Sequence, residues 1–243
     1  SECFSQGRVT FLILGTRCSR TCSFCFIKKG APFLPEEDEI TSIVKVTEET
    51  FLKHVVITSV TRDDLPDKGA GHFVKAVKAV KAINKDITVE ALIPDFTGER
   101  ALIRLVCESG VNILNHNIET VSRLYPEVRP QADYRRSLGV LKAAREFILL
   151  TKSGIMLGLG ETDKEIEEVF VDLRKVGVEI LTVGQYLKPG KDNLEIKEFV
   201  PLEKFEFYEK LAYNMGFRHV KSGPFVRSSY GADQMMAQFA ELK

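Results

Sequence analysis

The sequence predicts an α/β fold in which a parallel sheet curves into an open, TIM-like barrel of the partial (β/α)6 type. Runs of β-branched and apolar residues alternate with segments whose apolar residues recur at helical spacing, a pattern typical of βαβ units. Polar motifs follow these runs at their carboxyl ends, where barrels of this kind place their active residues. The length of 243 residues suits one such domain, so we expect residues 1–243 to form a single domain.

The expected strands are short apolar runs. The first ends at Gly15 and leads into a loop that contains three cysteines. The second runs into residues 61–70, which carry too much charge for a core and are expected to form a loop. The full set of expected strands is 8–14, 55–60, 87–93, 111–114, 151–157, 180–185 and a short strand at 219–221.

The expected helices lie between these strands. In residues 72–83 the apolar side chains recur at helical spacing and therefore share one face. Pro32 and Pro35 interrupt the chain before the first helix, and Gly216 closes the last one. The full set of expected helices is 36–51, 72–83, 102–107, 134–148, 165–176 and 203–215.

Composition and charge exclude several classes of protein. The chain has 34 Lys and Arg residues against 34 Asp and Glu residues, and this balance does not favour general nucleic-acid binding. No apolar run approaches the ~20 residues of a membrane span, and no signal peptide is expected. The few cysteines are partly clustered, which favours a reducing compartment: the cytoplasm, or an organellar matrix in a eukaryote.

Three of the five cysteines, Cys18, Cys22 and Cys25, fall within eight residues. Thiolates bind soft metals and iron–sulfur clusters, and spacings this short let one loop surround a single centre. A structural zinc site normally has four ligands, but the next candidate, His54, opens an expected strand. Three ligands suit a cluster that leaves one iron open. The alternatives are a disulfide pair with a spare thiol, or a small zinc knuckle.

Asn115, Asn117 and Glu119 follow the fourth expected strand. A carboxylate and two amides at one strand end are able to grip a ribose or an ammonium group, although either asparagine is also a candidate helix cap. Lys152 lies inside a strand-like run. Within a barrel its charge requires an anionic partner, and the alternative is an edge position facing solvent.

Other polar residues have weaker signals. Arg129 precedes Pro130 and is able to bind a carboxylate through two hydrogen bonds, or it is a surface arginine. Residues 158–160 (Gly-Leu-Gly) suggest close approach of the backbone to a ligand, and Gln185 ends the sixth expected strand beside the same pocket. Cys107 lies in a helical pattern and is expected to be buried packing.

The cysteine spacing, with Phe24 before the last cysteine, resembles that of the radical S-adenosylmethionine (SAM) enzymes. Over essentially the whole chain the sequence is similar to the lipoyl synthase family within that superfamily. The Arg-Ser-Ser-Tyr stretch at the end is specific to this family. The stretches that carry the resemblance are 18–25, 55–65, 92–96, 115–121, 151–161, 184–187 and 227–230.

The resemblance implies a sulfurtransferase of lipoate biosynthesis with a radical SAM barrel. This family inserts two sulfur atoms at C6 and C8 of a protein-bound octanoyl group. Cys18, Cys22 and Cys25 would hold a [4Fe-4S] cluster that binds SAM, and Phe24 would pack over it. The further SAM contacts implied by the resemblance are Asp64, Gly69, Ala70, Asn117, Glu119, Arg129, Lys152 and Gln185.

The family also has a second, auxiliary [4Fe-4S] cluster that supplies the sulfur. Three amino-terminal cysteines and a serine of the tail hold it; Cys3 matches the last of these cysteines, and Ser228 is preferred over Ser229 as the serine. We therefore interpret residues 1–7 as the remnant of the auxiliary-cluster segment and residues 222–243 as the tail. Because the chain starts at Ser1, we expect an amino-terminal truncation. The residues as printed are expected to cleave SAM without forming lipoyl groups, whereas the longer protein would do both.

Lys68 departs from the family, which has glycine at this position, and is expected to stiffen the turn. The implied partners are octanoylated lipoyl carrier domains, of the glycine-cleavage H protein or 2-oxoacid dehydrogenase E2 type, and an electron donor such as ferredoxin or flavodoxin. No nucleic-acid or membrane partner is expected. The protein is expected to be a monomer. The alternatives are another radical SAM sulfur-inserting enzyme, a non-catalytic carrier-protein binder that has lost the auxiliary site, and a zinc-stabilised binding module.

Overall fold

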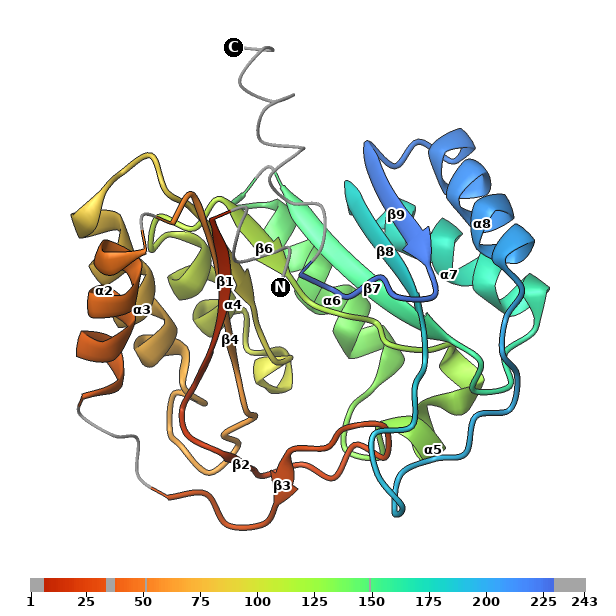
Figure 1. The fold of residues 1–243 in the computed structure, drawn as a ribbon, viewed down its shortest axis with the longest axis horizontal. Coiled ribbons are helices and arrows are strands. Elements are labelled where there is room, and N and C mark those ends of the chain that lie inside the picture. The colour runs from red at the N-terminus through yellow and green to blue at the C-terminus, as the bar shows by residue number, and fades with distance from the viewer. Residues whose placement is uncertain (1–6, 34–37, 51, 149, 230–243) are drawn as a thin grey trace.

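The computed structural model describes residues 7–33, 38–50, 52–148 and 150–229. Seven parallel strands form one sheet in the order β1-β4-β5-β6-β7-β8-β9. The sheet curves strongly and ends at β1 and β9 without closing, which confirms the predicted partial barrel (Figure 1). Its strands are β1 (Arg8–Ile13), β4 (His54–Ser59), β5 (Thr88–Leu92), β6 (Ile113–Asn115), β7 (Thr151–Leu157), β8 (Ile180–Gln185) and β9 (His219–Gly223).

Helices cover the outer face of the curved sheet (Figure 1). They form because their apolar side chains recur at helical spacing; α3, for example, buries Phe73, Ala76, Val77 and Val80. Thr162 and Glu165 start α7 with a reciprocal capping box. The helices are α2 (Glu39–Glu49), α3 (Ala70–Ile83), α4 (Arg100–Cys107), α5 (Tyr125–Val128), α6 (Tyr134–Arg145), α7 (Asp163–Lys175) and α8 (Leu202–Asn214), with short 3-10 turns η1 (Phe96–Gly98) and η2 (Ser122–Leu124).

The apolar core lies between the sheet and these helices, in two clusters. One cluster includes Val55 and Ile57 of β4 with residues of α3 and α4. The other includes Leu181 and Val183 of β8 with residues of α7 and α8. Because side chains alternate along a strand, the residues between them face the interior of the barrel. That interior is polar, and it holds Glu90 of β5 and Lys152 of β7, both fully buried.

All seven predicted strands are present, and the ends of the predicted helices match within three residues. The helix expected at 102–107 begins earlier, at Arg100, and the one expected at 134–148 ends at Arg145. Five short elements were not predicted: η1, η2, α5, and the two-residue strands β2 (Arg17–Cys18) and β3 (Lys28–Lys29), which pair with each other.

The charged loop 61–70 was expected to lie outside the core, and this was wrong for three of its residues. Arg62, Gly69 and Ala70 are buried. The Arg62 guanidinium donates to both carboxylate oxygens of Asp64, which allows its burial, and Gly69 and Ala70 lie at the start of α3. Within the part of the chain that the structure describes, every helix is too short or too polar to traverse a lipid bilayer.

Candidate active site

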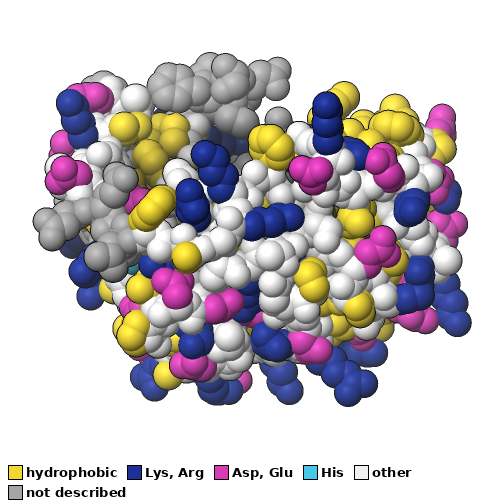
Figure 2. All heavy atoms as spheres, turned by 90° about the horizontal axis from the view of Figure 1, so that it is seen from below, with side chains coloured by type: hydrophobic (Ala, Val, Ile, Leu, Met, Phe, Trp, Pro, Cys, Tyr) yellow, Lys and Arg dark blue, Asp and Glu magenta, His cyan; other side chains and the backbone are white. Residues whose placement is uncertain are grey.

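The cysteine loop crosses the carboxyl-terminal mouth of the barrel, at the bottom of Figure 1, and Figure 2 views this mouth from below. Leu14 and Gly15, with φ of 68° and 88°, turn the chain out of β1 and into the loop. Cys18, Cys22 and Cys25 all line one cavity of about 270 Å³, here called the cysteine cavity. The predicted clustering of the three thiols is therefore realised in space.

The thiols fit an iron–sulfur cluster better than the two alternatives. Cys18, Cys22 and Cys25 are free, which does not fit a disulfide pair. Among the described residues, no group of three or more His, Cys, Asp or Glu side chains is close enough to share one metal ion, so a mononuclear zinc site does not fit either. Cluster ligands bind separate irons and need not converge on one point. Burial raises the pKa of Cys22 and of Cys25, so ligation must release their protons.

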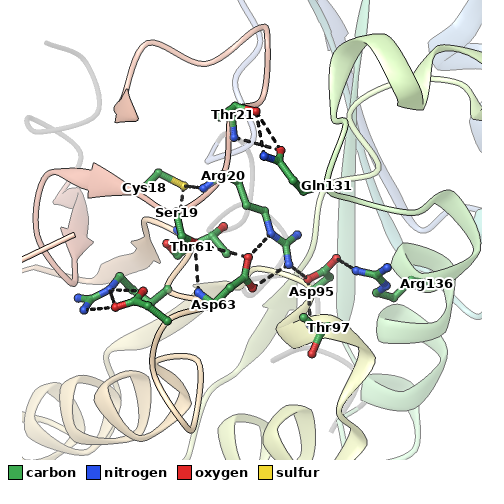
Figure 3. A network of polar contacts seen from close by, with 12 residues as sticks. Cys18, Ser19, Arg20, Thr21, Thr61, Asp63, Asp95, Thr97, Gln131 and Arg136 are labelled. Atoms are coloured by element: carbon green, nitrogen blue, oxygen red, sulfur yellow. Dashed lines mark hydrogen bonds and ion pairs between the residues drawn. The ribbon is translucent and has the colours of Figure 1, made fainter. Parts of the chain in front are cut away.

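A buried ionic network holds the cysteine loop in place (Figure 3). Arg20, between the first two cysteines, donates to both carboxylate oxygens of Asp63 at 2.7 and 2.9 Å and to Asp95 at 2.6 Å. Asp95 also accepts from Arg136 at 3.2 Å and from the Thr97 amide at 3.0 Å. Burial alone would raise the pKa of Asp95, but Arg20 outweighs it and lowers that pKa to about 2. The loop is thus tied to the ends of β4 and β5 and to α6.

The first cysteine is positioned by the same network. The Cys18 sulfur accepts from the amides of Arg20 and Thr61, at 3.4 and 3.3 Å. The Ser19 hydroxyl donates to the Thr61 carbonyl at 2.9 Å and accepts from the Asp63 amide at 3.1 Å. These contacts fix the position of the Cys18 sulfur at the cavity. Sequence reasoning missed Arg20 and Asp95; the signal available was a charged residue inside a cysteine motif.

Polar side chains from the ends of β4 and β6, together with Arg129, line the rest of the cysteine cavity. Several of their buried atoms lack a hydrogen-bond partner among the described residues: Ser59 Oγ, His116 Nε2, Asn117 Oδ1 and Arg129 Nε. Buried polar groups are rarely left unpaired, so these atoms indicate a polar ligand. The donor set suits a ligand rich in amino, carboxylate and hydroxyl groups, as SAM is.

Two of these residues are further defined by their surroundings. The Nδ1–H of His116 donates to the Ile93 carbonyl at 2.9 Å, and burial lowers the pKa of His116 to about 4, so the imidazole is neutral near pH 7. Arg129 is buried, contrary to the surface alternative, because its guanidinium donates to the Asn117 carbonyl at 3.0 Å and to the Tyr125 hydroxyl at 3.2 Å. A fixed cation therefore stands at the cavity wall.

Glu119 has a strained backbone. Its φ is 67°, in the left-handed region that a residue with a side chain rarely adopts. The Glu119 amide donates to the Gly154 carbonyl, and the Glu119 carbonyl accepts from the Met156 amide, both at 2.9 Å. These two hydrogen bonds join the segment after β6 to β7. Its carboxylate accepts from Asn117 at 3.1 Å; burial raises its pKa, partly offset by Arg129. The strain aims the carboxylate into the cavity.

A second cavity of about 340 Å³, the barrel cavity, adjoins the first. Phe24, Asn117 and Glu119 line both. Gln185 and Ser228, two predicted site residues, line the barrel cavity. The amide of Gln185 is fully engaged within the chain, however: its nitrogen donates to carbonyls including that of Glu198 at 3.1 Å, and its oxygen accepts from the Val200 amide at 3.0 Å.

The remaining predicted site residues lie elsewhere. Asp64, Gly69, Ala70, Lys152 and Ser229 are not among the residues lining either cavity, and Cys3 lies outside the described residues. Lys152 does have the anionic partner that its position requires, because its ammonium is 3.1 Å from the carboxylate of Glu90. The alternative of a solvent-facing edge is wrong, since both side chains are fully buried. The direct SAM contacts of this group stay predictions.

Comparison with known proteins accounts for this site. Residues 12–173 match the Radical SAM superfamily. A lipoyl synthase from Caldanaerobacter subterraneus subsp. tengcongensis is 50% identical over 234 residues, which cover 96% of this chain and 82% of that protein. The chain belongs to the lipoyl synthase family. It is accordingly a radical SAM sulfurtransferase that uses SAM and a [4Fe-4S] cluster, as the resemblance implied.

Further relatives agree with this assignment. A lipoyl synthase from Chlorobium limicola is 48% identical over 238 residues, covering 97% of this chain and 82% of that one. Among solved structures, methylornithine synthase matches with a TM-score of 0.62 and 15% identity, over 96% of this chain and 81% of that chain. Streptococcus suis SuiB bound to S-adenosylmethionine matches with a TM-score of 0.70 and 12% identity, over 89% and 50%. At these identities, the structural matches bear on the fold alone.

Proposed function

We propose that the chain inserts two sulfur atoms at C6 and C8 of an octanoyl group carried by a lipoyl carrier domain. The observation that supports this most is the junction of the two cavities at Phe24, Asn117 and Glu119, next to the three thiols. When bound, the cluster and SAM supply radical chemistry that removes hydrogen from an unactivated carbon, for which a general base would not serve. A substrate chain in the barrel cavity would lie beside that chemistry.

The chain's own residues bind and orient in this proposal. Cys18, Cys22 and Cys25 hold the cluster. The unpartnered atoms of Ser59, His116, Asn117 and Arg129 bind polar groups of SAM, and the neutral His116 does so without adding a charge. Asp64, Gly69, Ala70, Lys152 and Gln185 stay candidates for further contacts; the burial of Lys152 and the engaged amide of Gln185 favour supporting roles for these two.

Apolar residues keep water away from the thiols. Leu12, Ile27, Val60, Leu92 and Ile93 line the cysteine cavity together with Phe24. An apolar lining that excludes water strengthens electrostatic contacts within the cavity and protects a reactive radical from side reactions. The predicted role of Phe24 as a cover for the cluster is consistent with its place in the walls of both cavities.

The auxiliary cluster is part of the proposal. Ser228 lines the barrel cavity and Ser229 does not, which favours Ser228 as its serine ligand. Cys3 would be a further ligand. The carrier is an octanoylated domain of the H-protein or E2 type, and reduction comes from a ferredoxin or flavodoxin.

Iron analysis tests the cluster assignment. In anaerobically reconstituted protein, the Cys18/Cys22/Cys25→Ala variant is expected to lose about four irons and four sulfides relative to the wild type, because these thiols hold one [4Fe-4S] cluster. Cys107→Ala is the matched control and should keep its iron, since Cys107 is buried within α4. Zinc without sulfide in the wild type would contradict the function.

Substitution of Gly184 on β8 tests the role of the tail in holding the auxiliary cluster. A Cβ at Gly184 would lie 2.4 Å from the carbonyl oxygen of Val226, so Gly184→Ala must displace the tail from the barrel interior. In the full-length protein we expect this variant to lose the auxiliary cluster and lipoyl formation while SAM cleavage persists. Gly139→Ala, where nothing lies within 4 Å of the new Cβ, should leave all three unchanged. Iron counting, mass spectrometry of the carrier and SAM cleavage assays read out each step.

A further inference from the structure

One exposed surface next to the thiols has no part in the functions described so far. We define the cysteine-loop patch as Phe26, Lys28, Lys29, Phe33 and Lys191, all exposed. A hollow of about 240 Å³ opens directly at Cys25, and three of these five residues, Phe26, Lys29 and Lys191, line it. Figure 2 looks onto this face, where basic and hydrophobic side chains lie next to each other. The patch thus lies on the outer side of the loop that holds the thiols.

The basic residues of the patch are close to the cluster ligands along the backbone. Lys28 and Lys29 form β3, and Lys29 stands opposite Cys18 in the β2–β3 ladder. One short strand therefore separates two exposed ammonium groups from the predicted cluster.

The patch carries an excess of positive charge. Among the described residues, Lys28, Lys29 and Lys191 have no carboxylate within ion-pair distance, and Asp192 is the only acidic residue that lines the hollow. Neighbouring Lys188 differs, because Glu195 already pairs with it. Unpaired exposed cations at one site attract an acidic partner and raise its rate of association.

Two aromatic rings provide apolar contact area within this charge. Phe26 and Phe33 are 72% and 69% exposed, unusual values for phenylalanine. Both rings are held by a neighbour. The Phe26 ring packs against Gly190, so that a Cβ added at Gly190 would lie 2.6 Å from the ring. The Arg17 guanidinium stacks on the Phe33 ring, 4.8 Å from its centroid. Aromatic anchors held in place and ringed by charge are typical of protein-binding sites.

We propose that the cysteine-loop patch is the docking surface for an acidic redox protein that reduces the cluster. This rests on the proposed function, in which Cys18, Cys22 and Cys25 hold a redox-active cluster. In the step concerned, the donor protein gives up one electron and is oxidised, and the cluster accepts that electron and is reduced. Docking at the patch places the donor against the hollow that Cys25 lines. Small, transient interfaces of this kind are usual for electron transfer.

The geometry favours the electron donor over the octanoyl carrier. An octanoyl chain must enter the barrel cavity, whose lining includes Leu187, Pro189 and Arg227. The hollow at Cys25 is lined by other residues and shares only Phe26 with that cavity. The carrier and the donor therefore approach different parts of the mouth.

Charge reversal in the full-length, cluster-loaded enzyme tests the proposal. The variant K28E/K29E/K191E and the control K75E/K78E/K142E carry the same change in charge, and the control lysines are exposed on α3 and α6. Reduced flavodoxin and dithionite are compared as reductants in stopped-flow measurements of cluster reduction. With flavodoxin, we expect the patch variant to react about tenfold more slowly and to lose its dependence on salt. Dithionite is a small anion that needs no docking surface, so it should lose far less rate than flavodoxin does with the patch variant.

Three outcomes would overturn the proposal. In the first, the patch variant is reduced by flavodoxin as fast as the control variant is. In the second, the patch variant loses as much rate with dithionite as with flavodoxin. In the third, the patch variant shows a raised KM for an octanoyl carrier when dithionite is the reductant. The last would show that the patch binds the carrier. A failure of the proposed function itself would look different, because the wild type would then bind no cluster at all. Phe26→Ala, which leaves the charge unchanged, should slow reduction by flavodoxin and not by dithionite.

Discussion

Replacing Arg20 with alanine is expected to prevent the protein from retaining the iron–sulfur cluster and to destabilise the fold by about 3–5 kcal/mol. Arg20 is the shared partner of Asp63 and of Asp95, whose side chain is fully buried. Without the guanidinium, the Asp95 charge keeps Arg136 as its one remaining ion-pair partner among the described residues. The cysteine loop would also lose its ionic attachment to the ends of β4 and β5 and keep only hydrogen bonds such as that of Ser19 to Thr61, so the thiols would be held less firmly around the cavity.

Iron and sulfide content and urea unfolding measure the two effects separately. Arg20→Lys should give an intermediate result, because an ammonium keeps the charge but does not reproduce the forked contact with two carboxylates. Arg123→Ala is the control: it removes another forked arginine–carboxylate pair, with Glu165, on the surface and away from the thiols. It should leave the iron content unchanged. Full cluster occupancy in Arg20→Ala would disprove the role of the network.

Replacing Lys152 with methionine is expected to destabilise the fold by about 3–5 kcal/mol, because it leaves Glu90 charged and buried without its ammonium partner. Asn115 would still donate to Glu90 at 2.7 Å, but His54, 3.8 Å away, is too distant for a hydrogen bond. The double variant Glu90→Gln/Lys152→Met should recover most of the loss, since it removes both charges. Urea unfolding of the two variants and the wild type gives the comparison.

The pH dependence of stability provides a second readout of this pair. Burial alone would raise the pKa of Glu90, yet Lys152 and the hydrogen bonds hold it below its ordinary value of 4.5 in the folded protein. The unfolded chain therefore binds a proton first as the pH falls. The Glu90 carboxylate therefore makes its full contribution to the free energy of unfolding above pH 4.5. This contribution is lost as the pH falls through the lowered pKa of Glu90. The double variant should lose less stability between about pH 5 and about pH 3; an unchanged profile would contradict the assignment.

The effect of the Glu90–Lys152 pair should extend to the tail. Asn115 donates to Glu90 and, at 3.4 Å, to the carbonyl of Ser228. A buried ion pair on β5 and β7 therefore supports the β6 residue that contacts the tail. This explains how Lys152, a residue of a matching motif, can matter to the site without lining either cavity.

The parts of the site that the sequence predicted were those carried by local patterns. The thiol spacing predicted the cysteine cavity, and the polar residues after β6 were correctly placed at the strand end. The sequence around Arg129 was equally compatible with a carboxylate-binding role and with a surface position, and the resemblance favoured the site. The structure buries it because α5, which was not predicted, ends there and packs the guanidinium against Tyr125.

Residues with distant partners were beyond sequence reasoning. Lys152 required an anion, and that anion is Glu90, 62 residues away on a strand that is not its neighbour in the sheet. The only signal for Arg20 was its place as a charged residue inside the cysteine motif, and its partner Asp95 is 75 residues away. Such pairs form only when the curvature of the sheet brings strand ends together, so no local pattern encodes them.

By itself, the sequence determined the alternation of strands and helices, the parallel sheet, the cysteine triad and the family, because hydrophobic period and ligand spacing are properties of neighbouring residues. Only the tertiary structure decided which charges are paired inside the barrel, which polar atoms are left for a ligand, and where the tail runs. These depend on which strand ends meet at the mouth and on the low dielectric there, which makes each buried charge require a partner.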